Sequence, residues 1–208
     1  QFSLDEMQEL VRLAGQRGKK VMVHANGELP VRLALEAGCH SIEHGYFMGR
    51  ENLARMAEKG TVWVPTLAAM KSCGEHLDRG DRKLDPAVAR RTLQHQLEQV
   101  GLARELGVTI ALGTDAGSIG VLHGEAVREE LRLLLKAGCT LAEAIRCATW
   151  NGARLLGMDK QLGLIAKTRP ANFLVARGTP SQLPRKLSYL QAIFLNGSPC
   201  PKELFQKI

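Results

Sequence analysis

The chain has 208 residues, enough for one large domain or for one domain with an appendage, and its 45% hydrophobic and 24% charged residues are ordinary for a globular protein. No apolar run approaches the ~18 residues of a membrane span and no secretory signal opens the chain, so we expect no membrane partner. The net charge of +7 comes from Lys and Arg mixed with acidic residues along predicted helices, and only two Tyr and two Trp are available for stacking on bases. We therefore expect no nucleic-acid partner.

Cysteine usage indicates the redox compartment. The five cysteines are odd in number and widely spaced, without a Cys-x-x-Cys pair. This pattern argues against a disulfide framework or a cysteine-built zinc site and predicts a reducing, cytoplasmic location. Cys39 and Cys139 each follow Ala-Gly at a predicted helix exit, where we expect them to pack in the interior. The chain begins at Gln1 within a helical pattern, so we expect a fragment of a longer protein.

Helices and short β-rich runs alternate along most of the chain. Ser3 and Glu6 form a capping box, as do Thr140 and Glu143, and each opens a helical pattern. The predicted helices lie at 4–14, 30–38, 51–60, 86–107, 125–136 and 141–156, and the predicted strands at 21–23, 41–43, 61–64 and 108–112. Residues 67–85 are predicted to form a polar loop over one face, and 113–124 a Gly-rich loop. Strict alternation of this kind predicts an α/β fold with a parallel sheet.

The tail differs in character from residue 163 onward. Two short apolar runs, 173–176 and 192–195, lie between Pro- and Gly-rich turns, and Asn196-Gly197 is a hairpin signal. We expect a small separate β element joined near residue 160. The predicted domains are therefore 1–160 and 161–208.

Three predicted strands end in side chains that bind metals. His24 follows the first strand, His44 the second, and Asp115 follows the fourth in a Gly-Thr-Asp-Ala turn. Because the C-terminal ends of parallel strands meet at one edge of the sheet, we expect these three side chains to converge. Two imidazoles and a carboxylate suit zinc or a similar divalent ion, which activates water, and a carboxylate beside that water can act as proton shuttle. The pattern favours metal-assisted hydrolysis with Asp115 as the catalytic residue.

The other histidines have plainer interpretations. His40 is expected in a loop, and His76 and His95 are expected to face solvent. His123 is equally well explained as a substrate contact or as a helix-start residue. Glu43, beside His44, is expected to form a structural ion pair on the opposite strand face.

Several segments in order carry a resemblance to a known family. They are Val-His-Ala-Asn-Gly (23–27), Ala-Gly-Cys-His-Ser-Ile-Glu-His-Gly (37–45), Val-Pro-Thr-Leu (64–67), Leu-Gly-Thr-Asp-Ala-Gly (112–117), His-Gly-Glu (123–125) and Glu-Ala-Ile-Arg-Cys-Ala-Thr (143–149). Over about residues 3–180 the chain resembles the C-terminal half of an amidohydrolase-superfamily enzyme. It is most similar to the group of imidazolonepropionase-like enzymes and Xaa-Pro or Xaa-Arg dipeptidases.

The resemblance implies a fold and a set of roles. Residues 1–160 would form strands five to eight of a (β/α)8 TIM-like barrel, and 161–208 the return to a small β-sandwich. His24 and His44 would be metal ligands ending strands five and six, and Asp115, ending strand eight, would be both ligand and proton shuttle. Tyr46, His123 and Asn26 would lie near the substrate. The complete enzyme would use one or two divalent ions, zinc first among them, to hydrolyse an amide or other C–N bond in a small molecule of dipeptide or cyclic amide or amidine type.

The chain also departs from the family pattern. It lacks the paired His-x-His of strand one and the lysine of strand four, which fits a chain that begins after strand four. Asn26 stands where dipeptidase-like members often have His, and Thr168 and Asn172 stand where Gly and Asp are usual. A half-barrel exposes a sheet edge and an apolar face, so we expect a partner: the N-terminal half of the barrel or another copy in a homo-oligomer. The alternative is a catalytically incomplete barrel that acts only as a structural or assembly module.

Overall fold

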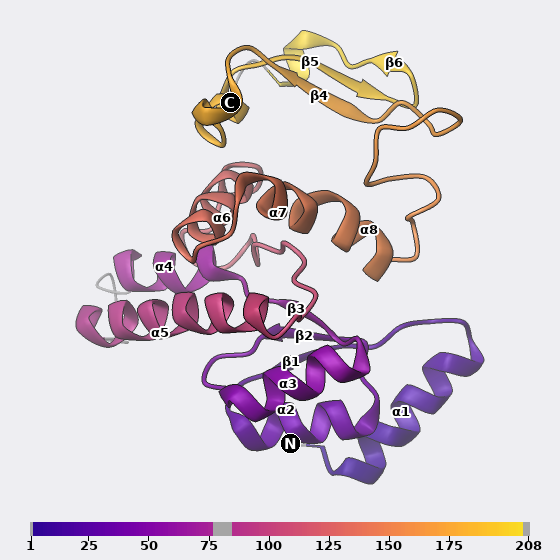
Figure 1. Ribbon diagram of the computed structural model, residues 1–208, viewed down its shortest axis with the longest axis vertical. Coiled ribbons are helices and arrows are strands. Elements are labelled where there is room, and N and C mark those ends of the chain that lie inside the picture. Colours follow the sequence, from indigo (N-terminus) through magenta and orange to yellow (C-terminus); the bar gives the residue numbers. More distant parts are fainter. Residues whose placement is uncertain (1, 77–84, 206–208) are drawn as a thin grey trace.

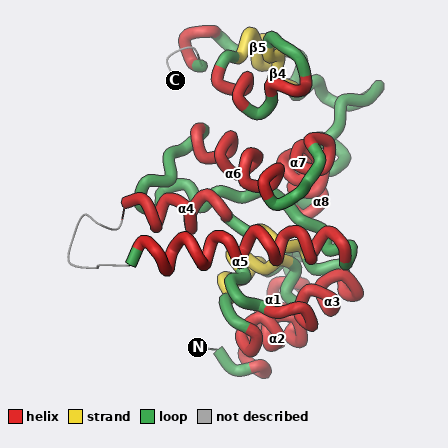
Figure 2. Tube along the Cα trace, turned by 60° about the vertical axis from the view of Figure 1, so that its left-hand side comes forward, coloured by secondary structure: helices red, strands yellow, loops and turns green. Residues whose placement is uncertain are grey.

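The computed structural model describes residues 2–76 and 85–205, in which helices alternate with parallel strands as predicted (Figures 1 and 2). The first part contains α1 Leu4–Gln16, β1 Met22–Ala25, α2 Glu28–Ala37, β2 Ser41–His44, α3 Gly49–Lys59, β3 Val62–Val64, α4 Leu67–His76 and α5 Pro86–Glu105. The second contains α6 Glu125–Lys136, α7 Leu141–Arg146, a π-helical turn Cys147–Asn151, α8 Gly152–Leu155, β4 Phe173–Ala176, β5 Leu190–Leu195 and β6 Ser198–Pro199. Short 3-10 turns lie at Pro180–Gln182, Arg185–Ser188 and Lys202–Leu204.

Local sequence signals set the ends of several helices. At the start of α1 the Ser3 hydroxyl accepts the Glu6 N–H at 3.3 Å, and the Glu6 carboxylate accepts the Ser3 N–H at 2.7 Å. Helices α2 and α3 both end at a glycine in the left-handed region, Gly38 and Gly60. Such a C-cap releases the chain toward the next strand without steric cost. The capping boxes and glycine stops predicted from the sequence are thereby confirmed.

The parallel sheet has the order β1-β2-β3. Met22 pairs with Ser41 and Ser41 with Val62, so all three strands end at the same edge. The predicted strand at 108–112 is present in part: Ile110 forms a parallel bridge with Trp63, with backbone hydrogen bonds from Trp63 to Thr109 and from Ala111 to Trp63, but no ladder longer than this forms there among the described residues. Beyond this bridge the Leu112 N–H bonds the carbonyl of Cys147, so the chain leaves the sheet.

The predicted loop at 67–85 is also wrong in part, because residues 67–76 form α4; residues 77–84 lie outside the described part of the chain. The signal that starts α4 is not local. The carboxylate of Glu130, on α6, accepts the backbone N–H groups of Leu67 and Ala68 at 2.9 and 2.6 Å. A cap supplied from more than sixty residues away cannot be read from the sequence around α4.

The helices pack around a core that the sheet shares. Helix α4 packs on α5 and α6, α5 also contacts α3, and α1 packs on α2 (Figures 1 and 2). The largest fully buried side chains include Trp63, Ile42 and Leu134. Cys39 and Cys139 are buried as expected. No helix in the described ranges is long and apolar enough to cross a membrane.

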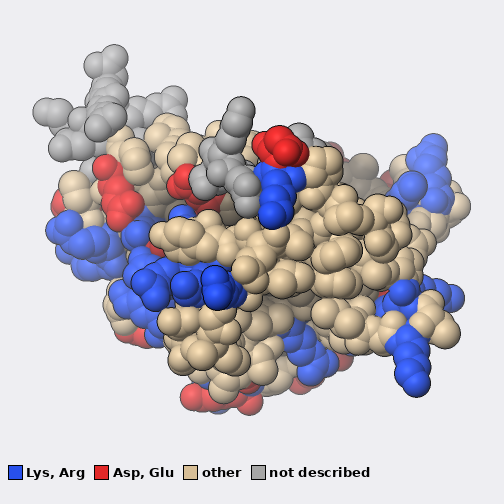
Figure 3. Space-filling model, turned by 90° about the horizontal axis from the view of Figure 1, so that it is seen from above, with Lys and Arg blue, Asp and Glu red and all other residues tan. Residues whose placement is uncertain are grey.

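The tail forms a separate antiparallel sheet in the order β4-β5-β6, drawn at the top of Figure 1. The predicted Asn196-Gly197 turn joins β5 to β6, with both residues at positive φ. A cavity of about 1200 Å³ lies between this sheet and α6, α7 and α8. Seen from the end of the molecule that carries this sheet, Lys and Arg gather in separate groups around a broad uncharged area (Figure 3).

Candidate metal and catalytic site

Two of the three predicted ligands meet at the C-terminal edge of the parallel sheet. His24 lies in β1 and His44 ends β2, and their ring centroids are 4.4 Å apart with the rings at 64°. In the sheet register Glu43, rather than His44, is level with His24. His44 has a φ of 65°, a left-handed conformation that departs from the pleat at the end of the strand. The predicted convergence of these two imidazoles is therefore present in the structure.

The backbone around His44 is fixed by buried side chains. The indole N–H of Trp63 donates to the His44 carbonyl at 2.9 Å, and Gln96, on α5, donates to the same carbonyl at 3.4 Å and to that of Pro65. Gln99, one turn further along α5, donates to the Gly45 carbonyl at 3.2 Å. Trp63, Gln96 and Gln99 are all at most 5% exposed. Helix α5 therefore holds the ends of β2 and β3 in place.

The His44 ring has one nitrogen engaged. Its Nδ1 lies 2.7 Å from the hydroxyl oxygen of Thr66, a buried residue two positions after the end of β3. Burial lowers the pKa of His44, as does the neighbouring His24, while the Asp115 carboxylate opposes them. The imidazole is thus biased toward its neutral form, the form that can bind a metal ion.

Tyr46 lies next to this pair. Its ring centroid is 5.8 Å from that of His44, and burial raises the pKa of the phenol to about 12, although a hydrogen bond with Thr66 opposes the increase. The backbone N–H of Tyr46 donates to the Asn26 side-chain oxygen at 2.9 Å, and the Asn26 amide nitrogen lies 3.3 Å from Nε2 of His24. Asn26 and Tyr46 therefore both lie beside the histidine pair.

Asp115 lies in the loop after residue 112. It has a φ of 56°, and its carboxylate accepts a hydrogen bond from the Ser118 hydroxyl at 2.6 Å. Among the residues that the structure describes, no three His, Cys, Asp or Glu side chains are grouped closely enough to hold a metal ion. The donor chemistry of the histidine pair fits a zinc-type ion, whereas the Asp115 carboxylate is engaged with Ser118.

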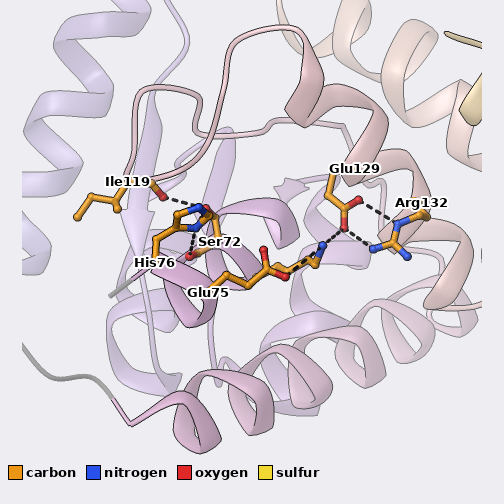
Figure 4. Close-up of polar contacts among 7 residues, drawn as sticks. Ser72, Glu75, His76, Ile119, Glu129 and Arg132 are labelled. Atoms are coloured by element: carbon orange, nitrogen blue, oxygen red, sulfur yellow. Dashed lines mark hydrogen bonds and ion pairs between the residues drawn. The ribbon is translucent and has the colours of Figure 1, made fainter. Parts of the chain in front are cut away.

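Helix α4 anchors the loop that carries Asp115 (Figure 4). The Ser72 hydroxyl donates to the Ile119 carbonyl at 2.9 Å and lies 3.2 Å from Nδ1 of His76. Gly120, at a φ of 73°, packs so closely against Ser72 and His76 that no side chain fits there. The loop after Asp115 therefore rests on α4 through a backbone contact that needs glycine.

The same helix is joined to α6 by an ionic contact. Lys71 bonds Glu129 at 2.9 Å and Glu75 at 3.4 Å, and Arg132 bonds Glu129 at 2.6 Å (Figure 4). The hydrogen bond from Arg132 holds the pKa of Glu129 down at about 2. These contacts keep α4 beside α6.

The remaining predicted residues have varied positions. His123 is exposed just before α6, and His95 is exposed on α5, stacked on Phe47 with ring centroids 4.9 Å apart. The solvent-facing interpretation of His76 is wrong, because this residue is half-buried against Ser72. His40 lies in the expected loop and accepts the Val21 N–H at 3.0 Å.

Glu43 makes a different contact from the one expected. Its carboxylate accepts the Ser41 hydroxyl at 2.6 Å, and no ion pair of Glu43 is found within the described part of the chain. Burial raises the pKa of Glu43, which fits a carboxyl group without a cationic partner.

Comparison with known proteins decides the family. The sequence model of the amidohydrolase family matches residues 1–202. The chain belongs to the amidohydrolase family. An ochratoxinase from Aspergillus niger is 31% identical over 163 residues, which cover 78% of this chain and 33% of the relative. An imidazolonepropionase from Paracidovorax citrulli is 31% identical over 182 residues, which cover 84% of this chain and 38% of the relative.

A solved structure agrees with this assignment. The crystal structure of a Xaa-Pro dipeptidase with methionine bound in its active site superposes with a TM-score of 0.86 at 31% identity, covering 96% of this amidohydrolase-family chain and 49% of that chain. The chain spans about half the length, or less, of the proteins that it matches. The sequence-based resemblance to the amidohydrolase family, with a parallel α/β fold, is confirmed.

Four residues around the site escaped sequence analysis of this amidohydrolase-family chain. They are Thr66, Ser72, Gln96 and Glu130. Each acts through a contact with a backbone or side-chain group distant in the sequence, such as Gln96 with Pro65. For Gln96 and Glu130 the available signal was a polar residue in the apolar setting of a predicted helix, since a polar side chain on a buried helix face needs a partner. Thr66 and Ser72 lie outside the predicted helices and gave no such signal.

Proposed function

We propose that this chain is part of a metal-dependent hydrolase that cleaves an amide or other C–N bond in a small molecule. The single observation that carries the proposal is the pair of imidazoles at the ends of two adjacent parallel strands, 4.4 Å apart between ring centroids. Adjacent strand ends in α/β folds are where ligands and catalytic groups gather. The family relationship and the enzymes among the relatives support the same reaction class.

The proposed roles follow from the geometry of these residues. His24 and His44 would hold a divalent ion, most simply zinc, together with Asp115 once its carboxylate leaves Ser118. Such an ion supplies activated water and polarises the scissile carbonyl or amidine carbon. Asp115 would accept the proton of that water and return it to the leaving nitrogen. Tyr46, Asn26 and His123 would contact the substrate.

A second part of the proposal concerns the barrel to which this chain would belong. Residues 1–160 would supply strands five to eight of a (β/α)8 barrel, and 161–208 part of a small β-sandwich. The free edge of β1 supports a missing neighbour, since Met22 is 62% exposed and His24 is also exposed. We propose that the N-terminal half of the barrel, or a second copy of this chain, covers this edge, and that the enzyme works in the cytoplasm.

A second candidate function has its own observation. Because no three-residue donor group is assembled in the described ranges, the chain by itself would serve as a structural or assembly module. The two functions differ in whether the histidine pair binds an ion.

Metal content separates them. Elemental analysis of the purified 208-residue chain is expected to give about one zinc-like ion per chain, lost in the double variant His24→Ala/His44→Ala. His95→Ala serves as the matched control, because this histidine is exposed on α5 and belongs to no proposed ligand set. Absence of metal in the wild-type chain, or its retention in the double variant, would refute the proposed metal site.

A further inference from the structure

Thr66 has an unusual backbone for its residue type. It has a φ of 48°, and a β-branched side chain in the left-handed region is strained. It is also only 3% exposed, so water does not solvate its polar groups as it does in most turns. A strained, buried residue persists only where its surroundings fix it, and such residues are concentrated at functional sites.

Two buried side chains from different helices fix this residue from both sides. On its N-terminal side, Gln96 of α5 donates to the carbonyl of Pro65. On its C-terminal side, the carboxylate of Glu130 on α6 accepts the N–H groups of Leu67 and Ala68. Gln96 is 1% exposed and Glu130 is fully buried. Glu130 accepts two backbone N–H groups and Gln96 donates from its amide nitrogen, and these bonds offset part of the cost of burying the two side chains; the Gln96 oxygen has no hydrogen-bond partner among the described residues.

The outcome of this arrangement is the position of one hydroxyl. Thr66 Oγ1 lies 2.7 Å from Nδ1 of His44, within ordinary hydrogen-bond distance. A hydroxyl that accepts the Nδ1 proton leaves Nε2 of the neutral ring with a free lone pair. Metal-binding histidines almost always donate their second ring N–H to an oxygen acceptor, commonly a carboxylate, a backbone carbonyl or water, which fixes both the tautomer and the orientation of the ring. The Thr66 hydroxyl oxygen stands in the place of that acceptor.

We propose that Thr66 is a positioning residue for His44: it accepts the Nδ1 proton so that Nε2 is free to bind an ion, and Glu130 and Gln96 hold Thr66 in place. The inference rests on the proposed function insofar as it assigns an ion to Nε2. It goes beyond that function by assigning a role to three residues outside the ligand set. Thr66 does not touch the reacting atoms, and in this role it acts through His44.

The first test reads the tautomer without any metal. Long-range ¹H–¹⁵N correlation spectra of the imidazole rings in the metal-free chain, with His44 assigned by its loss in His44→Ala, are expected to show His44 protonated on Nδ1. Thr66→Val, which keeps the shape and removes the hydroxyl, is expected to give a mixture of tautomers. Thr66→Ser restores the hydroxyl and is expected to restore the single tautomer. An unchanged tautomer in Thr66→Val would overturn the proposal.

The second test uses zinc affinity and a matched pair on α6. Thr66→Val and Glu130→Ala are each expected to weaken zinc binding about 10- to 100-fold, the usual effect of removing such a support. Glu129→Ala is the control, because it removes the neighbouring contacts to Lys71 and Arg132 and leaves the α4 cap intact (Figure 4). Equal losses in Glu129→Ala and Glu130→Ala would overturn the role of Glu130.

The two proposals fail in different ways. A wild-type chain that binds no zinc would refute the metal site, and the tautomer spectra would still decide whether Thr66 positions His44. A chain that binds zinc equally well with Val or Thr at position 66 would refute the positioning role and leave the metal site standing. If Glu130→Ala does not fold, the Thr66 pair still provides the decision.

Discussion

Gly45 offers a sharp test of how tightly the end of β2 is packed. It has a φ of 64°, and a Cβ built there would lie 2.8 Å from the indole nitrogen of Trp63 and closer still to the methyl group of Met48. Gly60, the C-cap of α3, has a similar φ of 70° but no atom within 4 Å of such a Cβ. The two glycines therefore share a backbone conformation and differ in the space around them.

The expected losses follow from this difference. An L-residue in the left-handed region costs roughly 1–2 kcal/mol, which is the whole effect expected for Gly60→Ala. Gly45→Ala adds an overpacking cost of roughly 1–3 kcal/mol, because Trp63 is fully buried and cannot move away without losing its bond to the His44 carbonyl. The total expected for Gly45→Ala is about 2–5 kcal/mol.

Guanidinium unfolding of both variants, followed by far-UV circular dichroism, measures these losses as changes in the free energy of unfolding. Unchanged m-values in the two variants would show that the comparison concerns the folded state. If Gly45→Ala lost no more stability than Gly60→Ala, the packing described around His44 would be wrong.

Three further predictions concern stability. Burial raises the pKa of Glu130 from its ordinary 4.5 to about 8. Its contribution to the free energy of unfolding is therefore full below pH 4.5 and is lost as pH rises through about 8. Urea unfolding across this range should show that loss in the wild type, and a smaller change of stability with pH in Glu130→Gln. Thr140→Ala removes the hydroxyl that accepts the Glu143 N–H at the start of α7 and is expected to cost about 1 kcal/mol by thermal unfolding, whereas Thr140→Ser should cost much less. Asn52→Leu leaves the carbonyls of Glu28 and Met48 without their buried donor and is expected to cost about 2–3 kcal/mol by chemical unfolding; a loss near zero would mean that water replaces the amide.

The sequence predicted those features of the fold that depend on local signals or on periodic patterns of apolar residues. Capping boxes at Ser3 and Thr140, together with glycine stops, located helices because those signals act within a single turn. The strand ends at His24 and His44 were visible because a parallel sheet brings such ends together. What could be predicted of the site was therefore the identity of the residues at the ends of the strands.

The errors have physical causes of a different kind. The sequence predicts a loop where α4 forms, because the cap of α4 comes from Glu130 on a distant helix. It predicts a longer strand at 108–112 than forms, because the backbone N–H of Leu112 bonds the carbonyl of Cys147 instead of a neighbouring strand. Thr66 was missed because nothing in its local sequence shows that its hydroxyl meets His44. Contacts between distant segments decide these features, and a single sequence does not display them.

Three residues of the candidate site and its surroundings, His44, Thr66 and Asp115, all have a left-handed backbone although none is glycine. At each of them glycine or asparagine would relieve conformational strain and so favour folding. Selection of variants for heat resistance alone would therefore tend to replace these side chains first. A heat-resistant variant that had lost these three side chains would show that the residues proposed to act in the site lower the stability of the fold.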